Sequence, residues 1–246
     1  MSDEAIPAAT LIVIREQPGR SPELLMVERS AKMAFAAGAL VFPGGRIDAS
    51  DDLAANEFRT SPAKVAAIRE TLEETAVPVG ISPAASPDLS AELQQKLLAG
   101  ELFGSALRLA GLEITPDVLT PFARWVPKFH AVRRFDTLFF IAKCPEGDWQ
   151  PLIVAGECAA ANWLSATQVL ERERSGSARL IFPTRRTLER LAQHESFDAI
   201  EDDARMHPIE PISPWVEEHG GEKLITIPSH LGFPVTQERL DGLWRG

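Results

Sequence analysis

The sequence has only two cysteines, Cys144 and Cys158, among its 246 residues. Two cysteines provide neither a disulfide framework nor the ligand ladder of a zinc module, so we expect a protein of a reducing compartment and place it in the cytoplasm. The five histidines show no H-x-x-x-H spacing, which argues against a zinc site.

Long apolar runs and an excess of positive charge are also missing. The apolar run over residues 8–14 ends at Arg15, and it is too short for a signal core or a membrane span. The 25 lysines and arginines are outnumbered by 35 aspartates and glutamates, giving a net charge of −10. A general nucleic-acid binder needs a basic face, so we expect neither a nucleic-acid partner nor a membrane partner.

Several catalytic motifs are absent as well: G-x-G-x-x-G after a strand, the P-loop, and the G-x-S-x-G nucleophile elbow. The amino-acid composition is typical of a globular protein, with 45% hydrophobic and 24% charged residues. The length suits one large or two small domains. We find no internal repeat or linker, so we predict one α/β domain with a helical insertion.

The pattern of apolar residues and turn signals predicts the main elements. We expect strands over residues 9–14, 23–28, 39–42, 135–143, 152–155 and 224–227. We expect helices over residues 62–76, 90–99, 103–110, 167–174 and 183–194. Ser61 and Pro62 form a strong start signal for the first helix, as N-cap and first helical residue.

That helix carries an unusual acidic arc. Its apolar stripe consists of Val65, Ile68, Leu72 and Ala76. On another side, glutamates at positions 70, 73 and 74 come within reach of one point. They repel one another, and they lie in the last turns, where the helix dipole favours cations.

Two interpretations of this arc remain open. It is either a solvated acidic face or a site where carboxylate oxygens bind a hard divalent cation. Two neighbours favour the cation. Arg69 can orient a carboxylate without taking the place of a metal, and Gly44 and Gly45 let the backbone come close to a ligand.

These residues together resemble the signature of the Nudix hydrolase family, G-x5-E-x7-R-E-U-x-E-E-x-G-U with U aliphatic. Gly45 matches the opening glycine, residues 69–74 match the R-E-U-x-E-E core, and Val77 matches the last position. Three features depart from the pattern. The gap between Gly45 and Arg69 is longer, which predicts an insertion within residues 54–61. Either Asp51 or Asp52 replaces the first glutamate. Thr71 and Ala76 replace an aliphatic residue and a glycine.

The resemblance implies a Nudix α/β/α sandwich with a mixed β-sheet. It also implies that Mg²⁺ or Mn²⁺ is held by Glu70, Glu73, Glu74 and the carbonyl of Gly45, with Arg69 as organiser of the catalytic group. The general base would be either a glutamate of the signature helix or Glu157, which resembles the loop glutamate of the family. Glu157 would then also contact the metal. The alternative for Glu157 is a plain surface loop residue.

The longer gap is similar to that of the family members that cleave coenzyme A and its acyl esters. In that subgroup, segments resembling Arg29-Ser30, residues 133–137 and Pro208-Ile209-x-Pro211 recur. We therefore expect Arg29, Arg133, Arg134 and Phe135 to bind substrate. Successive strand residues point to opposite faces, so at most one of the paired arginines enters the pocket. An exposed arginine pair and a core phenylalanine are the alternatives.

The predicted organisation is one Nudix domain over residues 1–246. Its core spans about 8–200, its box 45–77, and a proline-rich extension 206–246. We expect hydrolysis of coenzyme A or acyl-coenzyme A to 3′,5′-ADP and (acyl-)4′-phosphopantetheine, with a homodimer as candidate assembly. The alternatives are a pyrophosphatase of ADP-ribose, dinucleotides or oxidised nucleotides, a nucleotide sensor that does not cleave, and an interaction role for the extension.

Overall fold

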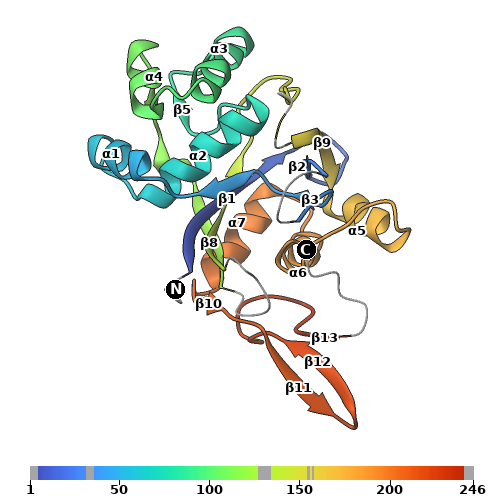
Figure 1. Cartoon of the computed structure of the whole chain (residues 1–246). Helices are drawn as coiled ribbons and strands as arrows, with labels where there is room; N and C mark the ends of the chain where they lie inside the picture. The colour runs from blue at the N-terminus through green and yellow to red at the C-terminus, as the bar shows by residue number, and fades with distance from the viewer. Residues whose placement is uncertain (1–4, 32–35, 127–133, 154–155, 157, 241–246) are drawn as a thin grey trace.

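The structure, a computed structural model, describes residues 5–31, 36–126, 134–153, 156 and 158–240 (Figure 1). At its centre lie two parallel strands, β1 (Ile6–Arg15) and β8 (Phe135–Lys143), which pair from Ile6 opposite Phe135 to Ile14 opposite Lys143. Residues 11–14 of β1 are completely buried. A strand covered on both faces has a continuous apolar run, which is what the sequence shows here.

Strands on both sides extend this pair into a mixed sheet. The order along the sheet is β10-β7-β8-β1-β2-β3, with β4 also paired to β1 and β9 also paired to β2. The bounds of these further strands are β2 (Glu23–Arg29), β3 (Leu40–Val41), β4 (Gly44–Arg46), β7 (Thr120–Trp125), β9 (Cys158–Ser165) and β10 (Pro211–Ile212). Two smaller sheets consist of β5 (Ile81–Ser82) with β6 (Glu113–Ile114), and of β11 (Trp215–His219), β12 (Glu222–Thr226) and β13 (Gln237–Arg239).

The outer edge of β1 is divided between two strands. Ile14 and Arg15 pair with β2, whereas residues 8–10 pair with β4. The sheet therefore forks along β1, and the link through Phe42 and Pro43 joins β3 on one branch to β4 on the other. This fork is where the candidate site lies.

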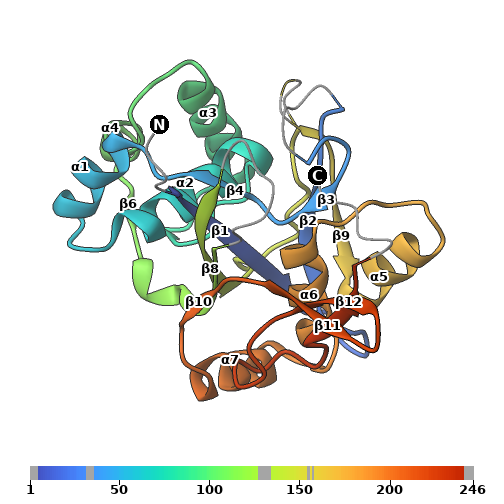
Figure 2. The same cartoon turned by 60° about the horizontal axis from the view of Figure 1, so that its bottom comes forward.

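Helices cover both faces of the sheet (Figures 1 and 2). Leu11 and Val13 of β1 belong to one apolar core together with residues of α1 (Ala49–Glu57), α2 (Pro62–Thr75), α3 (Pro87–Leu98) and α4 (Phe103–Leu109). Ile12 and Ile14 belong to a second core with residues of α5 (Ala166–Arg174), α6 (Phe182–Leu191) and α7 (Phe197–Met206). The alternation of β1 side chains thus divides two cores, and the predicted α/β fold with a mixed sheet between helices is confirmed.

Most predicted elements are confirmed, and the differences have local causes. Helix α3 begins at Pro87 rather than residue 90, because Ser86 accepts a hydrogen bond from the Leu89 amide. The strand predicted over 152–155 is wrong at 152 and 153, which are irregular, while 154 and 155 lie outside the described residues. The longer insertion after β4 includes helix α1, which begins at Ala49, ahead of the predicted segment.

The proline-rich extension contributes to the second core. Ile227, Leu231 and Phe233 are buried there, and the Phe233 ring packs edge-on against Trp125 at 5.4 Å between centroids. The Arg190 guanidinium lies 5.4 Å from the same ring. Among the helices of the described chain, none is both long enough and apolar enough to cross a bilayer.

Phe233→Ala should lower the free energy of unfolding by about 3–5 kcal/mol, because it leaves a cavity between Trp125 and Arg190. Val235→Ala removes an exposed apolar side chain from the same segment and should change stability by less than about 0.5 kcal/mol. Urea unfolding of both variants measures the difference. Equal stabilities would contradict a core role for this segment.

Candidate functional site

The acidic helix α2 begins and ends as its sequence requires. The Ser61 hydroxyl accepts a hydrogen bond from the Lys64 amide at 3.3 Å, and Pro62 takes the first helical position. Its apolar stripe, including Val65 and Leu72, is fully buried. The helix stops at Ala76, which has left-handed backbone angles (φ 58°). The Nudix signature places its late glycine at this position, and a left-handed C-cap explains why glycine suits it.

Thr71 stands where the signature has an aliphatic residue, and the structure shows why it is tolerated. Its side chain is completely buried, yet its hydroxyl donates to the Ala67 carbonyl at 2.7 Å. Thr75 does the same to the Thr71 carbonyl at 2.6 Å. Because each hydroxyl is satisfied within the helix, neither leaves a buried polar group without a partner.

Arg69 lies at the centre of the site with only 6% of its surface exposed. Its Nε and Nη2 donate to the two carboxylate oxygens of Asp51 at 2.8 and 2.9 Å, and Nη2 also reaches the Arg46 carbonyl at 3.1 Å. Its Nη1 donates to Glu70 at 2.9 Å and to Glu73 at 3.1 Å. Burial opposes the charge of Arg69, but the Asp51 hydrogen bond and the surrounding carboxylates outweigh it and raise the pKa.

The sequence left open whether Asp51 or Asp52 replaces the first glutamate of the signature. Asp51 is the one that contacts helix α2. It is 1% exposed, and it accepts from the Asp48 amide at 2.8 Å as well as from Arg69. Asp52, the next residue on α1, is exposed. Asp51 therefore ties the first turn of the inserted helix to the box helix with a bidentate pair.

Gly45 touches the Glu70 carboxylate directly. A Cβ built on Gly45 would lie 2.4 Å from the Glu70 Cδ, so no other residue fits without moving that carboxylate. Gly44 is equally constrained from the other side, because its Cβ would lie 2.5 Å from the Ala9 carbonyl oxygen. The two glycines thus let β4 lie between β1 and the acidic arc.

Glu74 is nearly buried and bridges the two branches of the fork. One carboxylate oxygen accepts from the Gly44 amide at 3.1 Å, and the other lies 3.7 Å from the Cys158 sulfur on β9. Cys158 is buried, as expected for a small core residue, but its contact with Glu74 was not predicted. The buried thiol of Cys158 thus packs beside the Glu74 carboxylate.

Glu73 is the most exposed of the three carboxylates, at 22% of its side chain. Burial raises its pKa, and the charge of Arg69 opposes that rise. Its backbone carbonyl accepts from the Gln94 amide group at 3.0 Å, and the same group donates to the Leu152 carbonyl at 2.9 Å. Gln94 thereby links α3 to the end of the box helix, and no sequence signal pointed to it.

The donor set fits a hard divalent cation. All three carboxylates come from one side of α2, two of them meet at a single nitrogen of Arg69, and the third lies at the backbone of the glycine pair. Oxygen donors of this kind suit Mg²⁺ or Mn²⁺. Within the described part of the chain, no three acidic, histidine or cysteine side chains are placed so that together they could hold a metal ion. The carboxylates are instead held by Arg69 and Gly44.

The remaining predicted site residues are Glu157 and the four proposed substrate-binding residues. Glu157 and Arg133 lie outside the described residues. Arg29 ends β2 and pairs with Cys158, next to the Glu74 carboxylate. Phe135 begins β8 opposite Ile6, and the Arg134 carbonyl accepts from the Ile6 amide at 2.8 Å. The β-sheet therefore brings Arg29 close to the acidic arc, whereas Arg134 and Phe135 lie at the start of the central strands.

Comparison with known proteins gives a consistent result. A Caenorhabditis elegans protein named nudix hydrolase 7 is 28% identical over 211 residues, which cover 82% of this chain and 66% of that protein. The crystal structure of a NUDIX hydrolase from Alicyclobacillus acidocaldarius is 29% identical and covers 81% of this chain and 96% of its own, with a TM-score of 0.69. No family model matches the chain.

The fold and the acidic helix define a Nudix-type α/β protein. In sequence and in fold, the chain is similar to proteins described as Nudix hydrolases. The chain spans 66% of the length of its worm relative, so that protein contains sequence with no counterpart here.

Asp51→Asn should destabilise the protein by about 3–5 kcal/mol, because it removes the buried charge that pairs with Nε and Nη2 of Arg69. Asp52→Asn makes the same chemical change one residue later, on the exposed side of α1, and should cost less than about 0.5 kcal/mol. Guanidinium unfolding at pH 7 compares the two. A larger loss for Asp52→Asn would show that the wrong aspartate has been assigned to Arg69.

Proposed function

We propose that this chain is a metal-dependent hydrolase of a diphosphate bond in a nucleoside-diphosphate-linked substrate. The observation that carries the proposal is the arrangement around Arg69. One buried cation holds Glu70 and Glu73 side by side on α2, and Glu74 is fixed separately at the backbone of Gly44. A divalent cation bound by these three carboxylates would offset their mutual repulsion.

In this proposal Glu70, Glu73, Glu74 and the Gly45 carbonyl hold Mg²⁺ or Mn²⁺. When bound, such an ion shields phosphate charge and activates water. The chain's own residues have distinct tasks. Arg69 positions two of the carboxylates and is held in turn by Asp51, while Gly45 keeps the backbone against the Glu70 carboxylate. Glu73, partly exposed and with a raised pKa, and Glu157 are the candidates for general base.

We propose coenzyme A or acyl-coenzyme A as the substrate. The support is the long insertion after Gly45, which includes α1, together with Arg29 at the end of β2 beside Cys158. Arg29, Arg133, Arg134 and Phe135 are the proposed substrate-binding residues, with a phosphate of the nucleotide as the group that an arginine would recognise. The alternative substrates are ADP-ribose, dinucleotides and oxidised nucleotides.

A non-catalytic nucleotide sensor with the same fold is the second hypothesis. It predicts that the carboxylates are dispensable. Glu73→Gln would then leave both metal binding and turnover as they are in the unaltered protein. The retention of all three glutamates favours the enzyme.

Coenzyme A incubated with the protein and Mg²⁺ or Mn²⁺ should yield 3′,5′-ADP and 4′-phosphopantetheine, separated by chromatography. Product should be absent with EDTA and reduced at least about 100-fold in Glu74→Gln, because a ligand to the metal is lost. Intact coenzyme A would discard this substrate. No metal-dependent product from ADP-ribose, dinucleotides or oxidised nucleotides either would overturn the enzymatic hypothesis.

Gly45→Ala should lower turnover by about 100-fold or more while the protein stays folded, because the new methyl group displaces the Glu70 carboxylate. Gly104→Ala is the control, since it adds the same methyl group within α4, where the nearest contact is the end of the Glu57 side chain at 3.3 Å. Steady-state turnover and circular dichroism of both variants are compared. Full activity in Gly45→Ala would contradict the placement of Glu70.

A further inference from the structure

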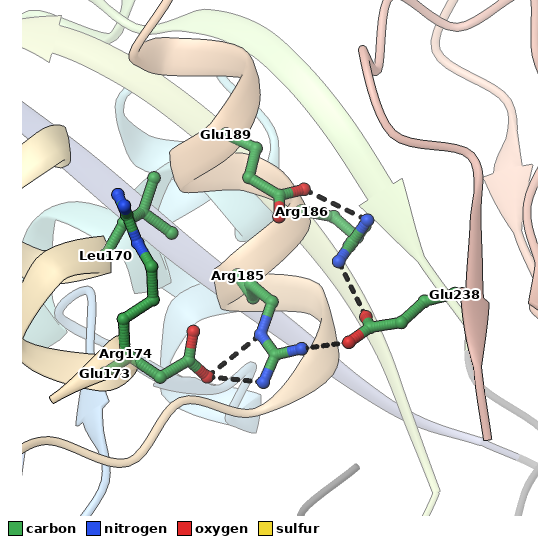
Figure 3. Close-up of a pocket in the computed structure, with 7 residues that line it drawn as sticks. All are labelled: Leu170, Glu173, Arg174, Arg185, Arg186, Glu189 and Glu238. Atoms are coloured by element: carbon green, nitrogen blue, oxygen red, sulfur yellow. Dashed lines mark hydrogen bonds and ion pairs between the residues drawn. The ribbon is translucent and has the colours of Figure 1, made fainter. Parts of the chain in front are cut away.

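A second cluster of charges lies on the other side of the central sheet from α2. It surrounds a cavity of about 440 Å³ lined by Leu170, Glu173, Arg174, Arg185, Arg186, Glu189 and Glu238 (Figure 3). These residues come from α5, α6 and β13. Among the described residues of the proposed catalytic site, none contributes to this lining, so the cavity needs its own explanation.

Two adjacent arginines of α6 bind one carboxylate from the C-terminal extension. Arg185 contacts one oxygen of Glu238, and Arg186 Nη2 contacts the other at 2.7 Å (Figure 3). Arg185 is held by Glu173, which accepts from its Nε at 2.9 Å and its Nη2 at 2.6 Å. A pair of oriented guanidiniums that grips two oxygens of one group is the arrangement by which proteins recognise phosphates as well as carboxylates.

Arg186 has binding capacity that this ion pair does not use. Its side chain is 3% exposed, and among the described residues its Nε has no hydrogen-bond acceptor. The facing Glu189 carboxylate lies 3.1 Å from Nη1, yet its nearer oxygen makes no hydrogen bond in the described structure. Burial lowers the pKa of Arg186 and raises that of Glu189. Buried donors beside a cavity are satisfied when a polar molecule enters it.

Glu238 is poorly anchored compared with the arginines that bind it. It belongs to β13, a three-residue strand that pairs only with β12 in the described structure. Both of its neighbours in the strand, Gln237 and Arg239, are exposed. Arg174, also exposed, lies at the cavity without a hydrogen bond or ion pair to any described residue. A ligand with more than one negative charge can therefore replace Glu238 and also attract Arg174.

We propose that this cavity between α5, α6 and β13 binds a small phosphate monoester, and that Glu238 occupies the anion position when no ligand is bound. The phosphate takes the place of the Glu238 carboxylate on Arg185 and Arg186, and the rest of the molecule lies in the cavity, whose volume is in the range of ordinary ligand sites. Binding releases β13 from α6, so occupancy is coupled to the position of the C-terminal strand. The proposal is independent of the catalytic one.

Titration calorimetry in EDTA at constant ionic strength tests this, with inorganic phosphate and AMP as probes. Glu238→Gln should bind both probes at least about tenfold more tightly than the unaltered protein, because an internal competitor that occupies the site most of the time is removed. The matched control is Glu222→Gln, which removes the same charge from an exposed position on β12 and should change affinity by less than about twofold.

Two further arms locate the site and its ligand. Arg174→Gln in the Glu238→Gln background should weaken binding about threefold or more, and its exposed position leaves the fold intact. Glu74→Gln, in the proposed catalytic site, should leave affinity unchanged. Tighter binding of AMP than of phosphate identifies the monoester, and equal binding would restrict the ligand to the phosphate itself and overturn the larger claim. No binding to Glu238→Gln, or equal affinity with and without Glu238, would overturn the site.

Discussion

Arg69 carries its positive charge inside the protein, where Asp51 on one side and Glu70 and Glu73 on the other share it. An unpaired buried guanidinium would be strongly unfavourable, and so would three neighbouring carboxylates without a cation. Pairing the guanidinium with the carboxylates removes both unfavourable contributions. The same contact fixes the inserted helix α1 against α2, so the geometry of the acidic arc and the packing of the insertion depend on one side chain.

Backbone close approach is the second constraint on the site. The fork along β1 pairs β4 with β1 and places it against α2. Only glycines fit there, with Gly44 against the Ala9 carbonyl and Gly45 against Glu70. The absence of a side chain is required at both positions, and at Gly44 the positive φ of 156° also favours glycine. The Gly44 amide then serves as the partner of Glu74, so a sheet irregularity supplies one contact of the acidic helix.

The C-terminal segment packs into the second core and also contacts the arginine pair of α6. Its Phe233 fills the second core against Trp125, and Gly232 lets the chain pass close to Arg190 and His207, where a Cβ would lie about 3 Å from both side chains. Beyond this buried part, the contacts of Glu238 with the described residues are those with the arginines of α6 and those of its short strand. The segment therefore combines a fixed portion, which the core requires, with a portion held mainly by charge.

The local sequence pattern predicted many of the helices and strands of this protein. The buried run of β1, the nine residues of β8, and the Ser61-Pro62 start of α2 are encoded by periodicity and capping, which act over a few residues, and all were predicted. The acidic arc followed from helical spacing alone. Strands β7 and β9 and helices α1 and α7 are among the elements that were not predicted. In β9, three alanines follow Cys158, and they carry little β-propensity of their own.

Which side chains contact one another depends on the tertiary structure. Asp51 and Asp52 are chemically identical neighbours, and burial against Arg69 distinguishes them. The contacts of Gln94 with Glu73, of Cys158 with Glu74 and of Glu238 with Arg186 join residues 21, 84 and 52 positions apart in the chain. Sequence by itself determines helices, strands and the residue types of a motif, because these depend on neighbours along the chain. The choice of partners depends on how the two cores and the forked sheet pack, which no local pattern records.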